Sequence, residues 1–298
     1  FSTDLGTLTV TERPRPKLGP SAVLIEVKAA GVNPVDWKVM AGGLDGLIDT
    51  VFPVIPGWDV AGVVAGVGPD VPEFVVGDEV IAYARKDTVG GGTFAELVAV
   101  PAVSVAAKPA TLTFPQAAGL PLAGGTALRT LDAIRVRGGD TVLVHAAAGG
   151  VGAFAVQIAT ARGARVIGTA SETNHEYLRG LGSDPVSYGA GLAERVRAIA
   201  PDGVDAVADF VGGQLDTTLA VLAADGRHAS VADPSVQEHG GRWIWVRPDG
   251  AETARLAALA EDGKLSVDIA QTFGLDGVAE AFELSQSGHV RGKLIIVP

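Results

Sequence analysis

One segment constrains the fold of this chain more than any other: residues 141–152, which read TVLVHAAAGGVG. Its apolar, β-branched start predicts a buried strand, and the apolar stretch from Val151 to Arg162 predicts a helix. The turn between them has the G-x-G-x-x-G frame, with Ala147 in the place of the first glycine. Such a turn presents backbone N–H groups and the positive end of a helix to a pyrophosphate, so the segment predicts a dinucleotide site.

The small residues of this turn have a physical purpose. Gly149 lacks the Cβ that would block a pyrophosphate from the backbone, and Gly152 allows the helix to pack closely on the strand. The alternative is a glycine-rich turn that only packs a helix on a sheet. The cofactor-binding residues predicted here are Ala148, Gly149, Gly150, Val151 and Gly152.

Strand and helix patterns alternate after residue 140, which predicts a doubly wound parallel sheet with helices on both faces. Strands are predicted at 141–146, 165–170, 186–188, 204–210, 226–232 and 243–246. Helices are predicted at 151–162, 174–181, 192–200, 214–223 and 251–261. His145 is expected in the sheet core as a neutral histidine.

The first third of the chain has a different pattern, with short strands separated by Pro and Gly, which indicates an irregular antiparallel barrel or sandwich. Strands are predicted at 22–29, 60–67, 79–83 and 93–100, and residues 1–10 read as a strand that lacks its first few residues. A helix is predicted at 115–135, and the tail (265–273, 278–287, 293–297) returns to the β-rich pattern. The expected fold class is α/β, with a β-rich domain at 1–115 and 264–298 and a dinucleotide-binding domain at 116–263.

Composition excludes several kinds of function. The 298 residues carry a formal net charge of −11, which disfavours binding to nucleic acid or to an anionic membrane. The chain has no cysteine, which excludes disulfides, thiolate nucleophiles, iron–sulfur clusters and zinc sites that need sulfur. The apolar run at 141–161 is interrupted by three glycines, His145 and Gln157, so we do not interpret it as a membrane span. We find no signal peptide and expect a cytoplasmic protein.

The end of the second alternating strand separates the two nicotinamide cofactors. An enzyme that uses NAD usually has Asp or Glu there to bind the ribose 2′-hydroxyl. This strand ends at Ala170 or Ser171, neither of which is acidic, so NADPH is the expected cofactor and NADH the alternative. A shift of one residue would make Glu172 a ribose acceptor, and no Lys or Arg follows the strand directly.

Seven motifs in one order carry a resemblance that runs along almost the whole chain. They are AGVNPVDWK (30–38), PGWDVAGVV (56–64), GDEV (77–80), GTFAE (92–96), AAGLPLAGGTAL (117–128), AAAGGVG (146–152) and RGK (291–293). With them the chain resembles the medium-chain dehydrogenase/reductase superfamily, and within it the zinc-free quinone oxidoreductase (zeta-crystallin-like) branch. The NPVDWK form is similar to the enone and alkenal reductase subgroup. The resemblance implies a GroES-like catalytic domain and a Rossmann domain.

The resemblance also implies that no zinc is bound. Zinc alcohol dehydrogenases of the superfamily have a cysteine where this chain has Asn33 and a histidine where it has Trp58. Neither residue is a plausible zinc ligand, and all five histidines lie at or after residue 145. The expected reaction is therefore hydride delivery to an acceptor that is already electrophilic, such as a quinone or an α,β-unsaturated carbonyl.

Four catalytic residues are implied by the same resemblance: Asn33, Asp36, Lys38 and Tyr83. Asn33 would bind a substrate carbonyl or a ribose, and Asp36 would orient Lys38 or a water. Lys38 would stabilise a developing enolate or donate a proton, and water or Tyr83 would supply the proton. The alternatives are a turn-supporting asparagine, a solvated carboxylate, a surface lysine and a core tyrosine.

Further cofactor contacts follow from the resemblance: Thr126, Ser171, Tyr188, Phe210, Val211, Gly212 and Lys293. Thr126 would lie near the nicotinamide, and Ser171 and Tyr188 near the adenosine ribose and its phosphate. Residues 210–212 follow a strand whose carboxyl end would face the ligand. Lys293 would contact the cofactor or join the two domains. Simple packing is the alternative for each.

The expected function is NADPH-dependent, zinc-independent reduction of a quinone or an enone. Two alternatives stay open: an enoyl-thioester reductase, and an NADPH-binding structural or regulatory protein without turnover. Family members commonly dimerise by pairing the edges of their cofactor-domain sheets, so we expect a homodimer through that sheet. Trp243 and Trp245 would lie at this interface or in an intradomain core.

Overall fold

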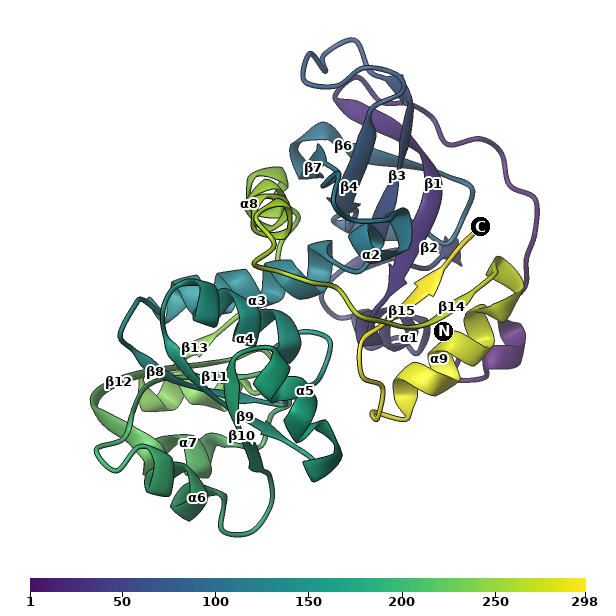
Figure 1. Cartoon of the computed structure of the whole chain (residues 1–298). Helices are drawn as coiled ribbons and strands as arrows, with labels where there is room; N and C mark the ends of the chain where they lie inside the picture. Colours follow the sequence, from purple (N-terminus) through teal and green to yellow (C-terminus); the bar gives the residue numbers. More distant parts are fainter. The chain divides into compact units, whose positions relative to one another are not determined.

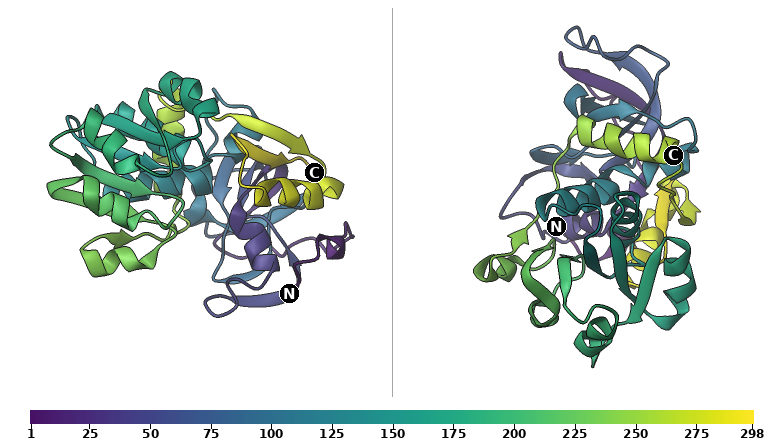
Figure 2. Two further views of the ribbon diagram at one scale, coloured as in Figure 1. Left: turned by 90° about the horizontal axis from the view of Figure 1, so that it is seen from below. Right: turned by 60° about the vertical axis from the view of Figure 1, so that its left-hand side comes forward.

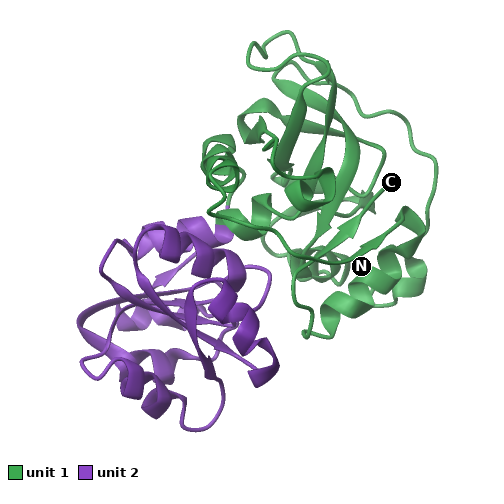
Figure 3. Cartoon of the chain, viewed as in Figure 1, with its two compact units in different colours: residues 1–125, 247–298 green, residues 126–246 purple.

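The computed structural model describes residues 1–298, which divide into two compact units (Figure 3). Unit 1 combines residues 1–125 with residues 247–298, and unit 2 consists of residues 126–246. Both ends of the chain therefore belong to unit 1. The expected α/β class is confirmed, because one unit is a mainly antiparallel sheet and the other a parallel sheet with helices. No helix has the length and the continuous apolar character needed to cross a membrane.

Unit 1 is built on a seven-stranded sheet with β1 (Ala22–Val32) at its centre. Along its length β1 pairs antiparallel with β6 (Leu97–Pro101), β3 (Asp59–Val67) and β15 (Lys293–Ile296). The remaining strands of this sheet are β4 (Glu79–Tyr83), β7 (Val105–Ala107) and β14 (Ile269–Phe273). Because β15 pairs with β1, the C-terminal tail is part of the β-rich unit. A separate two-stranded parallel sheet joins β2 (Asp49–Ile55) and β5 (Thr88–Gly91).

The core of unit 1 lies between this sheet and the C-terminal helix α9 (Val278–Gln286). In Figures 1 and 2 the yellow helix α9 lies beside β14 and β15. Ile25 of β1 and Phe282 of α9 are fully buried in the same apolar cluster. Three further helices belong wholly to unit 1: α1 (Pro34–Met40), α2 (Phe114–Ala118) and α8 (Gly250–Glu261).

The unit boundaries differ from those drawn on the sequence, at 115 and 264. Helix α8 packs on β7, where a Cβ on Gly250 would lie only 2.5 Å from the carbonyl oxygen of Val105, so unit 1 resumes at residue 247. Helix α3 (Pro121–Ala133) crosses the other boundary, which lies after residue 125.

Several predicted elements of unit 1 are corrected by the structure. Residues 1–10 contain no strand, only a short 3-10 turn η1 (Leu5–Thr7) capped by Asp4. The helix predicted at 115–135 is two helices, α2 and α3, because Gly119 ends the first and Pro121 has no N–H to continue it. The strand predicted at 93–100 begins at Leu97, because residues 92–94 turn to bond the carbonyls of residues 55–57. Helix α1 and strands β2, β5 and β7 lie outside the predicted elements.

Unit 2 is a six-stranded parallel sheet in the order β10-β9-β8-β11-β12-β13. Its strands are β8 (Thr141–His145), β9 (Arg165–Ala170), β10 (Ser183–Ser187), β11 (Val204–Asp209), β12 (Leu222–Ser230) and β13 (Arg242–Trp243). Its helices are α4 (Gly152–Ala161), α5 (His175–Gly180), α6 (Leu192–Ile199) and α7 (Leu215–Val221). In Figure 1 α4 lies above this sheet, and α6 and α7 lie below it. The doubly wound sheet is thus confirmed, although β13 is only two residues long where residues 243–246 were expected to form a strand.

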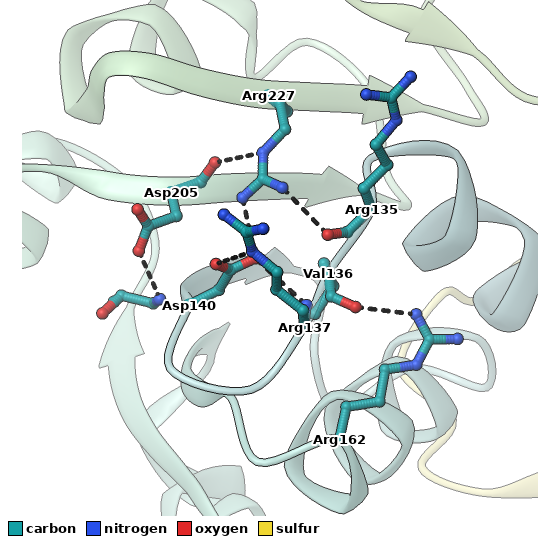
Figure 4. Close-up of polar contacts among 8 residues, drawn as sticks. Arg135, Val136, Arg137, Asp140, Arg162, Asp205 and Arg227 are labelled. Carbon is teal, nitrogen blue, oxygen red and sulfur yellow. Dashed lines mark hydrogen bonds and ion pairs between the residues drawn. The ribbon is translucent and has the colours of Figure 1, made fainter.

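The amino edge of this sheet is closed by a cluster of arginines and aspartates (Figure 4). Arg227 of β12 donates to Asp140 Oδ2 at 2.8 Å, to the Arg135 carbonyl at 3.0 Å and to the Asp205 carbonyl at 3.3 Å. The Asp205 side chain accepts from the backbone N–H of Thr141 at 2.8 Å. Asp140 is also 3.7 Å from the guanidinium of Arg137. These bonds fix the starts of β8 and β11 to each other and to the middle of β12.

Candidate active site

The predicted glycine turn joins β8 to α4 in unit 2, and its shape depends on the absence of a side chain at Gly152. A Cβ on Gly152 would lie 2.2 Å from the carbonyl oxygen of Ala146 and 2.7 Å from the Cα of Ala147, both of which are backbone atoms. The turn is also tied to β9, because Ala146 N–H donates to Thr169 Oγ1 at 3.0 Å and Ala147 N–H to the Thr169 carbonyl at 2.9 Å. Helix α4 can therefore begin directly against the end of β8.

The outer side of the same turn is open. A Cβ added to Gly149 would meet only the Ala146 carbonyl oxygen, at 3.3 Å, with no other atom within 4 Å. A pyrophosphate needs this kind of access to the backbone at the start of a helix. The N–H of Gly149 itself donates to the Ala146 carbonyl at 3.0 Å, so the predicted contacts to the phosphates of a dinucleotide would use the backbone of Ala148, Gly150 and Val151.

The carboxyl end of β9 carries a hydroxyl and no carboxylate. The strand ends at Ala170, and Ser171 Oγ lies 2.9 Å from Thr173 Oγ1 and accepts from Asn174 Nδ2 at 3.2 Å. Glu172 lies in the exposed 3-10 turn η3 (Glu172–Asn174), two residues beyond the end of the strand. The acidic residue is therefore not at the strand end.

Tyr188 follows the neighbouring strand β10, and its side chain is 62% exposed. Arg195 of α6 holds the segment around it by donating to the carbonyls of Ser187 at 2.8 Å, Gly189 at 3.2 Å and Ala190 at 2.9 Å. Sequence reasoning missed Arg195, because it lies seven residues after Tyr188 on another element. Its guanidinium is thereby fixed at the carboxyl end of β10, the strand that pairs with β9.

The loop after β11 contains the other predicted cofactor residues of unit 2. Phe210, Val211 and Gly212 follow Asp209, the last residue of the strand. Val211 is 56% exposed, and Gly212 has a φ of +86°, in the region that favours glycine. Thr126, in α3, is buried, and its carbonyl accepts from Thr130 Oγ1 at 2.7 Å.

Unit 1 contains a second candidate region, a buried polar cluster of Asn33, Asp36, Asp59 and Lys293. Asn33 caps α1, Pro34 occupies the first helical position, and Asp36 Oδ2 accepts from the Asn33 backbone N–H at 2.8 Å. Asp59 starts β3, and its Oδ1 accepts from the backbone N–H of Leu122 at 2.8 Å. The sequence N-P-V-D therefore ties α1 to the end of β1.

The Asn33 amide connects the charges of this polar cluster. Its Oδ1 accepts from Lys293 Nζ at 2.6 Å, and its Nδ2 donates to Asp59 Oδ2 at 2.8 Å and to the Gly31 carbonyl at 3.3 Å. Lys293 Nζ also donates to the Val32 carbonyl at 3.0 Å. Both ends of the amide are thus engaged within unit 1. The predicted bond from Asn33 to a substrate carbonyl would require one of these contacts to break.

Burial governs the charge of this polar cluster. It raises the pKa of Asp36 to about 8, although the hydrogen bond from Asn33 N–H lowers it. It raises the pKa of Asp59 to about 6, against the opposing effect of Lys293, and it lowers the pKa of Lys293. Asp36 Oδ1 is buried and has no hydrogen-bond partner. Asp36 therefore holds its proton more tightly than a free aspartate does, which reduces the negative charge beside Asp59.

The two remaining predicted catalytic residues have contrasting surroundings. Lys38 is exposed on α1, with its Nζ 5.4 Å from the centre of the Trp37 ring. Tyr83 is buried, with its ring centre 6.1 Å from that of Trp58, and burial raises its pKa above the ordinary value. Tyr83 is therefore a weaker acid than a free tyrosine.

Sequence reasoning located both regions but missed several residues that hold them. Lys293 was predicted to contact the cofactor or to join the two domains; its Nζ donates to Asn33 within unit 1. Asp59, which accepts from the Asn33 amide, was not among the predicted site residues. Asp209 and Ser230 were not singled out; each is the last residue of a strand at the carboxyl edge of the unit 2 sheet. For Asp209 the available signal was its position after the valine-containing segment of β11, whereas β12 has no β-branched residue before Ser230.

The donor atoms in these regions do not fit a zinc site. No group of three or more His, Cys, Asp or Glu side chains is arranged so that it could hold a metal ion.

Comparisons with known proteins agree with this architecture. Residues 19–110 match the protein family described as "Alcohol dehydrogenase GroES-like domain", and residues 181–296 match the family described as "Zinc-binding dehydrogenase". The chain is 35% identical over 292 residues to an NADPH-dependent alkenal/one oxidoreductase, chloroplastic, of Arabidopsis thaliana, which covers 95% of this chain and 74% of the relative. It is also 35% identical over 292 residues to a 2-methylene-furan-3-one reductase of Solanum lycopersicum, which covers 95% of this chain and 73% of that protein.

A similar solved structure is the quinone oxidoreductase from Coxiella burnetii, with a TM-score of 0.84 and 33% identity over 99% of this chain and 96% of that one. An alcohol dehydrogenase superfamily protein from Novosphingobium aromaticivorans has a TM-score of 0.87 and 33% identity over 98% of this chain and 96% of that one. The glycine turn, the two-unit architecture and these identities together show that the chain belongs to the medium-chain dehydrogenase/reductase superfamily, in its quinone oxidoreductase and alkenal/one oxidoreductase branch.

Proposed function

We propose that this protein is an NADPH-dependent reductase of quinones or α,β-unsaturated carbonyls that works without zinc. The main support for the proposal is the turn between β8 and α4. This turn has no room for a side chain at Gly152, whereas its backbone at Gly149 is accessible to a ligand. The printed names of the relatives from A. thaliana, S. lycopersicum and C. burnetii support the substrate class. NADPH is preferred over NADH because β9 ends at Ala170 and is followed by the hydroxyl of Ser171, while the exposed Glu172 lies two residues beyond the strand.

The residues of unit 2 would bind and orient the cofactor. The turn at 148–152 would hold the pyrophosphate, Ser171 and Tyr188 the adenosine ribose and its 2′-phosphate, and residues 210–212 with Thr126 the nicotinamide half. When bound, NADPH supplies a hydride from C4 of its nicotinamide. An enone accepts this hydride at its β-carbon, and the resulting enolate then needs one proton.

The residues of unit 1 would orient the acceptor and provide positive charge. Lys38 has an exposed ammonium group, which would stabilise the enolate oxygen, and water or Lys38 would supply the proton. Asn33, Asp36 and Lys293 would fix the start of α1, which carries Lys38, through the bonds at its N-cap. In this proposal Asn33 and Asp36 are positioning residues, and Tyr83 contributes packing against Trp58.

The test is the oxidation of NADPH and of NADH against one quinone and one conjugated enone, before and after treatment with a metal chelator. We expect turnover with NADPH, a higher KM for NADH, and no loss of rate after chelation. The variant K38M should lower kcat for the enone and leave the Kd of NADPH unchanged. NADPH binding without reduction of either acceptor would instead favour the thioester reductase or the non-catalytic alternative.

The expected homodimer and cellular location stay predictions. Trp243, which ends the edge strand β13, and Trp245, two residues later, are 42% and 39% exposed, with ring centres 6.2 Å apart. This exposure supports an interface along that edge. Sedimentation of the wild type and of a W243S/W245S variant would test it. The expected cytoplasmic location is a prediction that fractionation of the source cells would test; the A. thaliana relative is described as chloroplastic.

A further inference from the structure

Two titratable side chains stand where the strand order of unit 2 reverses. From β8 the chain proceeds to β9 and β10 on one side of the sheet and later to β11 and β12 on the other. Ligands of open parallel sheets bind in the crevice outside the carboxyl ends of the strands at such a point. His145 ends β8, Asp209 ends β11, and the two residues are paired in register.

The Asp209 carboxylate is bonded to the loop that follows it. Its Oδ1 accepts from the backbone N–H groups of Val211 and Gly212, both at 3.0 Å, and its Oδ2 from Gly212 N–H at 3.2 Å. The loop itself is partly open to solvent: Val211 is 56% exposed, and a Cβ on Gly213 would meet no atom within 4 Å. The carboxylate of Asp233, in the loop after β12, also accepts from the backbone N–H of Gly213. Gly212 and Gly213 both have positive φ angles, of +86° and +68°. Asp209 therefore fixes a conformation that the loop sequence alone does not fix.

Ser230 connects Asp209 to the next loop along the same edge. It ends β12 and is fully buried, and its Oγ donates to Asp209 Oδ2 at 2.8 Å. The same Oγ accepts from the backbone N–H groups of Ala232 at 3.1 Å and Asp233 at 3.0 Å. A serine hydroxyl has one hydrogen and two lone pairs, so all of its capacity is used and its hydrogen must point to Asp209. The loops after β11 and β12 are thus joined through two side chains.

No cation pairs with Asp209. Burial lowers the pKa of the neighbouring His145 to about 4, although Asp209 acts to raise it, so the imidazole is neutral at physiological pH. Its Nε2 is buried and has no hydrogen-bond partner. The carboxylate is therefore stabilised by N–H and O–H donors alone, and these donors are the ones that shape the loops.

The sheet order shows which half of a dinucleotide these loops would meet. If the turn after β8 holds the pyrophosphate and the ends of β9 and β10 hold the adenosine, the opposite half extends over β11 and β12. We propose that Asp209 and Ser230 are positioning residues. They join the loops 210–213 and 231–235 into one rigid surface that binds the nicotinamide half of the cofactor. This inference rests on the proposed function, since it assumes that the protein binds NADPH.

The experiment compares D209N and S230A with the control D205N. Asp205 is on the same strand and also accepts a backbone N–H, from Thr141 at 2.8 Å, but it lies at the amino edge. Kd values are measured for NADPH and for 2′,5′-ADP, which carries the adenosine half alone. Loss of a hydrogen bond to a charged group weakens an interaction by roughly tenfold or more, so D209N and S230A should raise the Kd and KM of NADPH by about that factor.

The affinity of both variants for 2′,5′-ADP should remain within about twofold of wild type, and D205N should change neither ligand's affinity even if its Tm falls. Parallel weakening of NADPH and 2′,5′-ADP, or wild-type NADPH affinity in both variants, would overturn the inference and leave the proposed function intact. Failure of the wild-type protein to bind NADPH would instead contradict the proposed function. S230A is the smaller change, so its affinities for NADPH and 2′,5′-ADP test the inference if D209N fails to fold.

Discussion

The buried aspartates at the two edges of the six-stranded sheet in unit 2 are stabilised by different partners. At the amino edge, Asp140 is paired with Arg227, whose guanidinium also bonds backbone carbonyls (Figure 4). At the carboxyl edge, Asp209 has no cationic partner and is bonded to N–H and O–H groups of two loops. The amino edge is closed by the ion pair of Asp140 and Arg227, whereas the carboxyl edge presents the β8–α4 turn, whose backbone is accessible at Gly149. We infer from this difference that the amino edge stabilises the sheet, whereas the carboxyl edge is available to an anionic ligand.

The largest expected effect is at the carboxyl edge. The substitution Gly152→Ala would place a Cβ 2.2 Å from the Ala146 carbonyl oxygen, so the start of α4 must move. We expect NADPH affinity to fall roughly 100-fold, which corresponds to about 3 kcal/mol. The control Gly180→Ala, in α5, meets nothing within 4 Å and should bind NADPH like wild type. Isothermal titration of both variants measures the difference, and normal binding by G152A would remove the main support for the site.

The next effect is at the amino edge. The substitution Arg227→Ala leaves Asp140 buried with only the exposed Arg137 nearby, at 3.7 Å. Since the Arg227 side chain is itself 29% exposed, we expect a loss of about 2 kcal/mol in the free energy of unfolding. The control Arg179→Ala breaks an exposed pair with Glu176 and should change stability by less than about 0.5 kcal/mol. Urea unfolding gives both values, and a large change in the Kd of NADPH for R227A would contradict the division between the edges.

In unit 1 a buried carboxyl group, that of Asp36, is stabilised in a third way, by protonation. Because burial raises the pKa of Asp36 from 3.8 to about 8, the folded chain binds this proton more tightly than the unfolded chain. Its contribution to stability is thus fully present below about pH 4 and is lost as the pH rises through about 8. Asp36→Asn should therefore gain stability relative to wild type as the pH rises from 6 to 8. Urea midpoints at the two pH values measure this gain, and an equal difference at both would show that Asp36 does not change its protonation.

The smallest expected effect concerns the segment around Tyr188. Arg195→Ala removes bonds to the carbonyls of Ser187, Gly189 and Ala190, which frees the Tyr188 backbone to move. The loss of about 1 kcal/mol should raise the KM for NADPH about fivefold with little change in kcat. The KM for NADH should change less, since NADH lacks the 2′-phosphate. Equal changes for both cofactors would indicate that this end of the crevice does not recognise the phosphate.

Local sequence patterns predicted the parallel sheet of unit 2 better than they predicted the contacts among the candidate site residues. The apolar runs and the glycine turn were sufficient for β8, α4 and β9, because their burial and period are encoded within a few residues. The bonds of Lys293 to Asn33 and of Ser230 to Asp209 join residues that are distant in sequence, so no local pattern contains them. Likewise, the break between α2 and α3 was visible in Gly119 and Pro121, but the return of α8 to unit 1 depends on its packing against β7.

The central claim is that NADPH bound at the carboxyl edge delivers its hydride to a conjugated acceptor without a metal. The most direct measurement uses NADPH deuterated at one face of C4, with a conjugated enone and chelator-treated enzyme, and mass spectrometry of the product. We predict one deuterium at the β-carbon of the product from one of the two C4 epimers and none from the other. Absence of deuterium from the product with both epimers, or turnover that returns only when zinc is added, would contradict the claim.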